Sequence, residues 1–180
     1  NEFDNEERAK EFVKKKQQDS ESKEKEEKVK EQEKEKRIEQ RQIAKERIPV
    51  IAKSLLECKQ GTITVDDITM ELADSGKANF CYSTSDNYDD VFHIGLGEAL
   101  CKADPKLVYC GLFEQGEKIR VIVYAGEDIS KEKSAGEIVK SISQILGGAG
   151  GGSPKFAQGG GIEKSKKEDA IKNAKSMIIE

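Results

Sequence analysis

The stretch GGAGGGSPKFAQGGG, at residues 147–161, holds eight of the 16 glycines in this 180-residue chain. Glycine has no Cβ atom, so a run of glycines lets the backbone bend freely and lets other atoms come close to it. The sequence on both sides of the stretch is patterned like helix. The role of the stretch therefore depends on the elements that hold its two ends.

Amphipathic helices are predicted on either side of the glycine stretch. Ser-Ala-Gly-Glu at residues 134–137 has the spacing of a capping box, and Gly147 is the residue type expected just past a helix end. After a short expected strand at 156–158, Ser-Lys-Lys-Glu at 165–168 forms a second capping box that predicts the last helix. The apolar face of the helix before the stretch consists of Ile138, Val139, Ile142, Ile145 and Leu146.

Upstream of these helices, the pattern predicts a strand at 80–83 and a helix at 90–103. Two β-rich runs at 107–113 and 118–124 flank Glu-Gln-Gly-Glu, which is typical of a hairpin. The order of strands and helices predicts an α/β fold class, with a long N-terminal helical arm followed by a small α/β sandwich. In this sandwich, helices cover a mixed sheet.

The N-terminal arm is predicted to be one exposed helix over residues 3–47, which lack glycine and proline and place Glu and Lys four apart. Eighteen of the 24 residues in Lys14–Arg37 are charged. Because no a/d heptad is sustained, a solvated spacer or an antiparallel arm is favoured over a dimer zipper. Pro49 is expected to break the helix or to begin the next one. We therefore expect a helical arm and dimerisation subdomain at 1–60 and a globular subdomain at 61–180.

A short apolar face follows Pro49 at the end of the charged arm. Such a face needs a cover, which is either the globular domain or another subunit. We expect a homodimer, because pairing with a second copy is the simplest cover. The residues assigned to dimerisation are Val50, Ile51, Leu55 and Leu56.

The sequence holds no recognisable catalytic or metal-binding motif. No glycine in the stretch is followed by Lys as a P-loop requires, and the spacing of a dinucleotide-binding GxGxxG fails. The only histidine, His93, is expected to be a partly buried helix residue rather than a general base. No metal or catalytic site is expected, since the cysteines form no CxxC pair and are interpreted as buried thiols in a reducing cytosol: Cys58, Cys81, Cys101 and Cys110.

Partners and location follow from charge and hydropathy. No run approaches the roughly 18 apolar residues of a membrane-spanning helix, and no signal peptide is recognisable at Asn1. We expect a fragment of a longer cytoplasmic protein with no membrane partner. The net charge of −4 argues against a general nucleic-acid coat but allows a local basic patch.

Backbone chemistry is the remaining possibility for the glycine stretch. Successive glycine N–H groups can form a concavity that binds anions, and nearby lysines add positive charge. Nucleic-acid phosphate fits such a surface, whereas a flexible linker is the alternative that stays open. The residues assigned to RNA binding are Gly147, Gly148, Gly150, Gly151, Gly152, Lys155, Gln158, Gly159, Gly160, Gly161, Lys164, Lys166 and Lys167.

Residues 150–161 resemble the GGGRPDMAQGGG motif of the C-terminal domain of alanyl-tRNA synthetases. Pro154, Ala157, Gln158 and all six flanking glycines match, and the resemblance covers about residues 78–180. Looser similarity extends to the DHHA1 domain of DHH-family phosphoesterases. The chain departs from the motif at three positions, where Ser153, Lys155 and Phe156 stand in place of Arg, Asp and Met.

The resemblance implies a non-catalytic segment of an alanine–tRNA ligase that joins two subunits and holds the outer corner of tRNA(Ala). It implies no cofactor in this segment and no DNA partner, with ATP, Mg and Zn used in domains upstream. Two alternatives stay open. One is the substrate-binding domain of a DHH phosphoesterase, and the other is a purely structural coiled-coil module.

Overall fold

The computed structural model describes the backbone of residues 2–58, 60–65, 68–85 and 87–180, and side chains from residue 22 onward within those ranges. The chain forms two compact units, Asn1–Glu39 and Gln40–Glu180. The helices are α1 (Glu2–Glu57), α2 (Asp90–Ala103), α3 (Ala135–Ile145) and α4 (Lys167–Ile179), with short 3-10 turns at Ile129–Lys131 and Lys164–Lys166. The strands are β1 (Gly61–Val65), β2 (Ile68–Asp74), β3 (Asn79–Thr84), β4 (Leu107–Gln115), β5 (Lys118–Ala125), β6 (Ala149–Gly152) and β7 (Phe156–Gly161).

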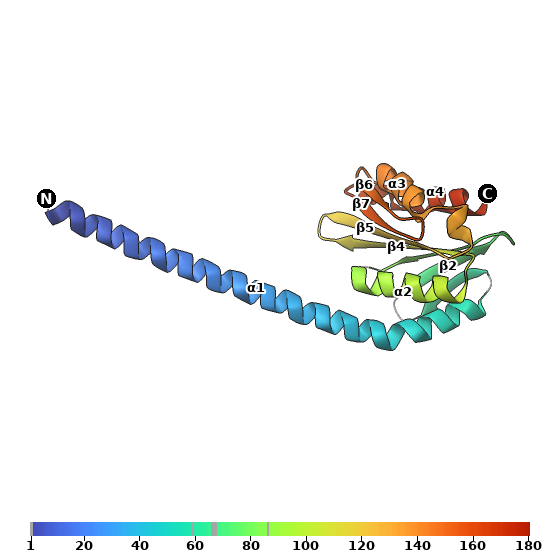
Figure 1. The fold of residues 1–180 in the computed structure, drawn as a ribbon, viewed down its shortest axis with the longest axis horizontal. Coiled ribbons are helices and arrows are strands. Elements are labelled where there is room, and N and C mark those ends of the chain that lie inside the picture. The colour runs from blue at the N-terminus through green and yellow to red at the C-terminus, as the bar shows by residue number, and fades with distance from the viewer. Residues whose placement is uncertain (1, 59, 66–67, 86) are drawn as a thin grey trace. The chain divides into compact units, whose positions relative to one another are not determined.

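One mixed sheet organises the second unit, with strand order β1-β2-β3-β4-β5-β7-β6. Strands β3 and β4 pair in parallel, and the other neighbours pair antiparallel. Helices α3 and α4 pack on one face, whereas α2 and the C-terminal part of α1 pack on the other (Figure 1). The predicted fold class, an α/β sandwich with a mixed sheet covered by helices, is confirmed.

Two apolar cores lie on opposite faces of this sheet. The α3 and α4 side holds Val121 and Ile138, and the α2 side holds Phe92 and Leu96. Strand β4 contributes to both, so all residues from Leu107 to Phe113 are buried. A strand that is buried on both faces has a continuous run of apolar residues, and this run is why the sequence predicted β4.

The predicted helix at 90–103 and the predicted hairpin are both confirmed, and the hairpin strands extend to Gln115 and Ala125. Three strands were missed, namely β1, β2 and β6. Strand β1 is largely exposed and β6 is built only of Ala and Gly, so neither shows the apolar alternation by which strands are recognised. The prediction that the second capping box begins the last helix at Ser165 is wrong, because Ser165 lies in a 3-10 turn and α4 begins at Lys167.

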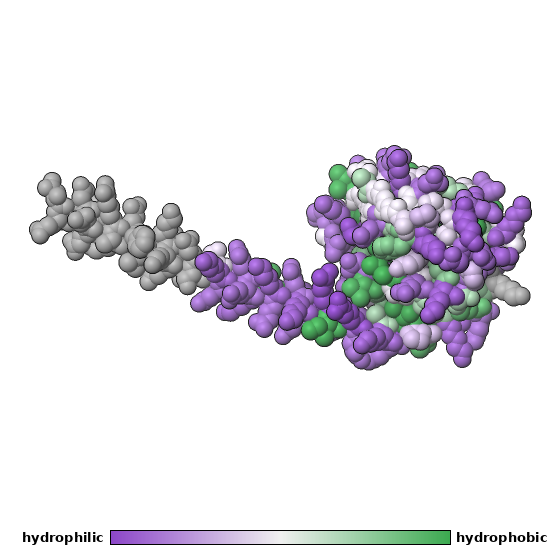
Figure 2. All heavy atoms as spheres, viewed as in Figure 1, coloured by the Kyte–Doolittle hydropathy of each residue, from purple (hydrophilic) through white to green (hydrophobic). Residues whose placement is uncertain are grey.

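Pro49 neither breaks α1 nor begins a new helix, since α1 continues through it to Glu57. Proline removes one backbone hydrogen bond from a helix, and packing must compensate for that loss. Ala44, Ile51 and Leu55 supply the packing, because they are buried in the α2-side core. Residues 40–57 thus belong with the globular unit, whereas the expected boundary lay at residue 60. In the first unit, the described side chains of residues 22–39 are exposed and predominantly hydrophilic (Figure 2).

The apolar face after Pro49 divides into two pairs. Ile51 and Leu55 are 0% and 1% exposed within the globular unit, so the globular domain covers them. Val50 and Leu56 remain 60% and 46% exposed. Only the second pair is accessible to a partner subunit, and dimerisation through it stays a prediction.

A polar cluster is buried under α2. The Tyr109 hydroxyl lies 2.6 Å from Ser83 Oγ and 2.8 Å from His93 Nδ1, and all three side chains are fully buried. The His93 ring also stacks on Phe113, with ring centroids 4.6 Å apart. His93 was expected to be partly buried; it is instead fully enclosed, because its own hydrogen bonds and ring stacking replace contact with water.

Candidate functional site

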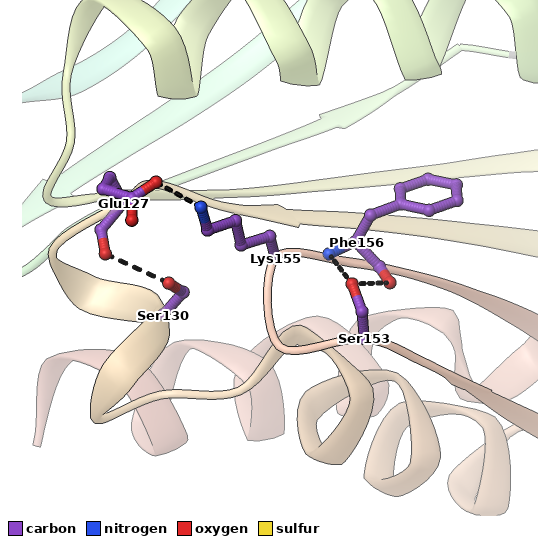
Figure 3. A network of polar contacts seen from close by, with 5 residues as sticks. All are labelled: Glu127, Ser130, Ser153, Lys155 and Phe156. Atoms are coloured by element: carbon purple, nitrogen blue, oxygen red, sulfur yellow. Dashed lines mark hydrogen bonds and ion pairs between the residues drawn. The ribbon is translucent and has the colours of Figure 1, made fainter.

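The glycine stretch is an edge hairpin rather than a loop. Strands β6 and β7 pair antiparallel from Ala149 opposite Gly160 to Gly152 opposite Ala157, and β6 is the last strand of the sheet. In the turn, the amide of Ser153 donates to the carbonyl of Phe156 at 2.8 Å. The Ser153 hydroxyl also accepts from the Phe156 amide at 3.1 Å (Figure 3). The stretch is therefore tied into the fold at its centre, which a slack linker would not be.

The C-terminus of α3 leads directly into this hairpin. Gly147 has a φ angle of 69°, and its amide donates to the Gln144 carbonyl at 3.1 Å. The next amide, of Gly148, donates to the Ser143 carbonyl at 2.8 Å. This pair of bonds is a Schellman motif, so the prediction that Gly147 ends the helix is confirmed.

One face of the hairpin lies directly under α3. A Cβ atom at Gly150 would come within 2.4 Å of Val139 Cγ1, and one at Gly159 within 2.4 Å of Ser143 Oγ. Ser143 Oγ also accepts a hydrogen bond from the Gly160 amide at 3.1 Å. Glycine is required at these positions because the helix packs against the backbone itself.

The opposite face of the hairpin is open. A Cβ at Gly151 would meet no atom within 4 Å. Because side chains alternate across a strand, Gly151 shares this face with its cross-strand partner Gln158 and with Arg120 of β5. We call this face the shelf, consisting of Lys118, Arg120, Ala149, Gly151, Gln158 and Gly160. Most of these residues line a shallow hollow of about 480 Å³.

Three of the glycine amides expected to bind anions are engaged within the fold. The amides of Gly147, Gly148 and Gly160 donate to Gln144, Ser143 and the Ser143 hydroxyl. The other glycines lie in strands β6 and β7; β6 is the edge strand and pairs only with β7, so alternate backbone groups of β6 face no neighbouring strand. Within the shelf, Ala149, Gly151 and Gly160 contribute no side chain larger than a methyl group, and assignment of the glycines to RNA binding stays a prediction.

Two of the four expected lysines are already compensated by carboxylates. Lys155, in the turn of the hairpin, forms an ion pair with Glu127, which lies in the segment after β5 (Figure 3). Lys164 donates to Glu114 Oε2 at 2.6 Å and to a turn carbonyl at 3.0 Å. The pKa of the Glu127 carboxyl is lowered by its hydrogen bond from Lys155. These two lysines offer less charge to a ligand than the sequence suggested.

Sequence reasoning missed the two cationic side chains on the shelf, Lys118 and Arg120. Arg120 Nη2 donates to Gln158 Oε1 at 3.3 Å, and its buried Nε donates to no acceptor among the described residues. Neither cation has a carboxylate partner in the described part of the chain. Their spacing of two within the predicted strand at 118–124 was the signal that could have placed them on one face.

Phe156 packs on Tyr124, with ring centroids 4.8 Å apart, and is half-buried.

The four cysteines are free thiols, and burial raises the pKa of Cys101 to about 12. The described residues contain no cluster of three or more His, Cys, Asp and Glu side chains that could hold a metal ion. None of the helices searched in the described ranges is apolar and long enough to cross a membrane.

Comparison with known proteins places this geometry in a family. Residues 78–180 match the family model of the DHHA1 domain. The chain belongs to the DHHA1 domain family. The match begins one residue before β3 and includes α2, the β4–β5 hairpin, α3, the shelf and α4.

The relatives include alanine–tRNA ligases from two organisms. The enzyme of Nitrosopumilus maritimus is 41% identical over 171 residues, which are 95% of this chain and 18% of that protein. The enzyme of Cenarchaeum symbiosum is 41% identical over 92 residues, which are 51% of this chain and 10% of that protein. The chain therefore spans less than a fifth of the length of these relatives.

A solved structure shares the fold. The crystal structure of the C-Ala domain from Aquifex aeolicus alanyl-tRNA synthetase superposes with a TM-score of 0.57 at 24% identity. The alignment covers 61% of this chain and 99% of that domain. The likeness shows that the globular part has the architecture of that domain.

Proposed function

We propose that this chain is the C-terminal domain of an alanyl-tRNA synthetase and that it binds tRNA(Ala) at the shelf. The observation that carries the proposal is the glycine hairpin, which combines an open face, where Ala149, Gly151 and Gly160 contribute no side chain larger than a methyl group, with cations from β5. Structured RNA is recognised through shape, sugar and exposed groups, so a surface that permits close backbone approach suits it. The family membership and the similarity to alanine–tRNA ligases support the same function.

The domain would act by tethering. Aminoacylation and hydrolysis of mischarged tRNA would take place in other domains, which would hold ATP, Mg and Zn. A module that grips the body of the tRNA raises the local concentration of its acceptor end at both sites. In this proposal the domain also joins two subunits, and the parent enzyme acts in the cytoplasm.

Binding of a tRNA(Ala) transcript to the chain, followed by fluorescence anisotropy, tests the proposal. The affinity should fall log-linearly between about 50 mM and 200 mM salt, because phosphate contacts release counterions. A duplex DNA of similar length serves as the control and should bind more weakly. Absence of any tRNA binding at the lower salt concentration would contradict the proposal and favour a purely structural module.

A further inference from the structure

Lys118 and Arg120 lie two residues apart on β5, so their side chains leave the sheet on the same side, about 7 Å apart along the strand. Neither side chain forms an ion pair within the described part of the chain. By contrast, Lys155 in the hairpin turn and Lys164 after β7 form ion pairs with Glu127 and Glu114. The shelf thus carries two cations without a carboxylate partner in the described ranges, whereas Lys155, the one lysine of the glycine stretch, is paired.

Arg120 is oriented by a neighbouring side chain. Gln158 of the neighbouring strand accepts from its Nη2, while the buried Nε has no acceptor among the described residues. A partly buried cation without a counter-charge is unfavourable, and an anionic ligand would remove that cost. The planar fork of a guanidinium matches the two oxygens of a phosphodiester, so its fixed orientation favours such a ligand.

The floor beside these two cations explains why a chain of phosphates would fit there. Gly151 faces open space on the shelf, and the Ala149 side chain is a single methyl; Gly160 also lacks a side chain, although a Cβ there would lie 2.1 Å from the Ile119 carbonyl oxygen. A sugar–phosphate strand could approach the sheet closely at this point. Because floor amides such as that of Gly160 are engaged within the fold, side chains must help to neutralise the charge of the ligand, and the two cations are placed to do so.

We propose that Lys118 and Arg120 form the phosphate-binding contact of the shelf and hold the sugar–phosphate backbone of RNA, with Gln158 positioning Arg120. This inference rests on the proposed function and goes beyond it. It transfers the charge contact from the four lysines that the sequence favoured, Lys155, Lys164, Lys166 and Lys167, to two residues on β5. The ligand is the polyanionic backbone of RNA, which the shelf binds through its two cations and through close approach to the glycine floor.

The experiment compares single charge-removing variants of the full chain in tRNA binding at several salt concentrations. Lys118→Gln and Arg120→Gln should each lower the affinity about tenfold at the lowest salt and reduce the salt slope by about one. Lys77→Gln is the matched control, because Lys77 is exposed in the turn after β2. It removes the same charge and should change the affinity less than twofold, with circular dichroism confirming that every variant folds.

Two further variants separate charge from geometry. Arg120→Lys keeps the charge but loses the planar guanidinium. Compared with Arg120→Gln, it should restore the salt slope of the parent but only part of the parent's affinity. Gln158→Ala keeps Arg120 but releases its orientation, and a loss of about threefold is expected at an unchanged salt slope.

The outcomes distinguish the two proposals. If the parent chain fails to bind tRNA, the proposed function and this inference both fall. If the parent binds while Lys118→Gln and Arg120→Gln behave like Lys77→Gln, the tRNA-binding function stands and the phosphate contact on the shelf is wrong. If only Lys155→Gln and Lys164→Gln lose affinity, the phosphate contact is made by Lys155 and Lys164 instead.

Discussion

The Ser143 hydroxyl accepts a hydrogen bond from the Gly160 amide at 3.1 Å, and this contact joins helix α3 to strand β7. The space around the hairpin glycines shows that they have two different roles. Those facing α3 let the helix lie on the backbone, whereas those facing the shelf leave a surface open. Substitutions on the two sides should therefore affect different properties.

Replacing Gly159 with Ala should destabilise the chain, and replacing Gly151 with Ala should not. The new methyl at residue 159 would overlap Ser143 Oγ, and overpacking of this kind costs about 1–3 kcal/mol. The methyl at residue 151 meets no atom within 4 Å, so a change below about 0.5 kcal/mol is expected. Urea unfolding of both variants measures the difference, and equal stabilities would show that α3 does not pack on Gly159.

The larger change Gly151→Val extends the same test to function. This variant should stay folded yet bind tRNA more weakly, since its side chain stands on the shelf. Gly160→Val is unsuitable for the purpose, because its Cβ would lie 2.1 Å from the Ile119 carbonyl oxygen. Retention of full tRNA affinity by folded Gly151→Val would argue that RNA does not approach this face.

The structure shows where sequence reasoning succeeds and where it stops. The Gly147 helix end and the β4–β5 hairpin follow from local rules on φ and turn residues, so the sequence alone located them. Strand β6 is stabilised by pairing with β7 and by contact with α3, which no pattern within Ala149–Gly152 records. The compensation of Lys155 by Glu127 is equally non-local, because 28 residues separate the two.

Removing the hydroxyl of Tyr109 should lower the free energy of unfolding, because two buried neighbours each lose a hydrogen bond. In Tyr109→Phe, both Ser83 and His93 lose the hydrogen bond to the Tyr109 hydroxyl inside a fully buried site, and the contact between them that remains is longer, at 3.4 Å. A loss of about 1–3 kcal/mol is expected, because hydrogen bonds of buried polar groups are costly to remove. Tyr124→Phe is the matched control, since the Tyr124 hydroxyl makes no hydrogen bond in the described ranges, and its urea midpoint should stay near that of the parent.

Acid should weaken the attachment of α4 to the sheet at Glu71. Hydrogen bonds from Lys175 and from the Tyr82 hydroxyl lower the pKa of the Glu71 carboxyl below its usual 4.5. A carboxyl with a lowered folded-state pKa stabilises the fold above its unfolded pKa, and this contribution is lost as the pH falls through the folded value. Because Glu71 is partly exposed, the effect should stay below about 1 kcal/mol.

The variant Glu71→Gln isolates this contribution. Its stability relative to the parent, measured by urea unfolding, should be lowest near pH 7 and should approach the parent value as the pH drops below about 4. Glu117→Gln, in the exposed β4–β5 turn, is the control and should show no such convergence. A difference between Glu71→Gln and the parent that is independent of pH would mean that the ion pair with Lys175 contributes nothing measurable.

The prediction of a homodimer rests on the exposed half of the apolar face on α1. Val50 and Leu56 remain accessible, whereas Ile51 and Leu55 lie in the core and would disrupt the fold if changed. The chain of 20.0 kDa should therefore sediment as a dimer of about twice that mass at micromolar concentration. The double variant Val50→Lys and Leu56→Lys should sediment as the monomer, because it buries two charges in the interface while keeping good helix formers.

The control for this experiment is Ile162→Lys, which changes another exposed apolar residue, 62% accessible, in the segment between β7 and α4. This variant should remain dimeric, since its position is not on α1. A parent that sediments as a monomer would contradict dimerisation altogether. If instead the double variant stays dimeric, the chain pairs through another surface, and Val50 and Leu56 are exposed for a different reason. Sedimentation of the three proteins therefore tests both the existence of the dimer and its location on α1.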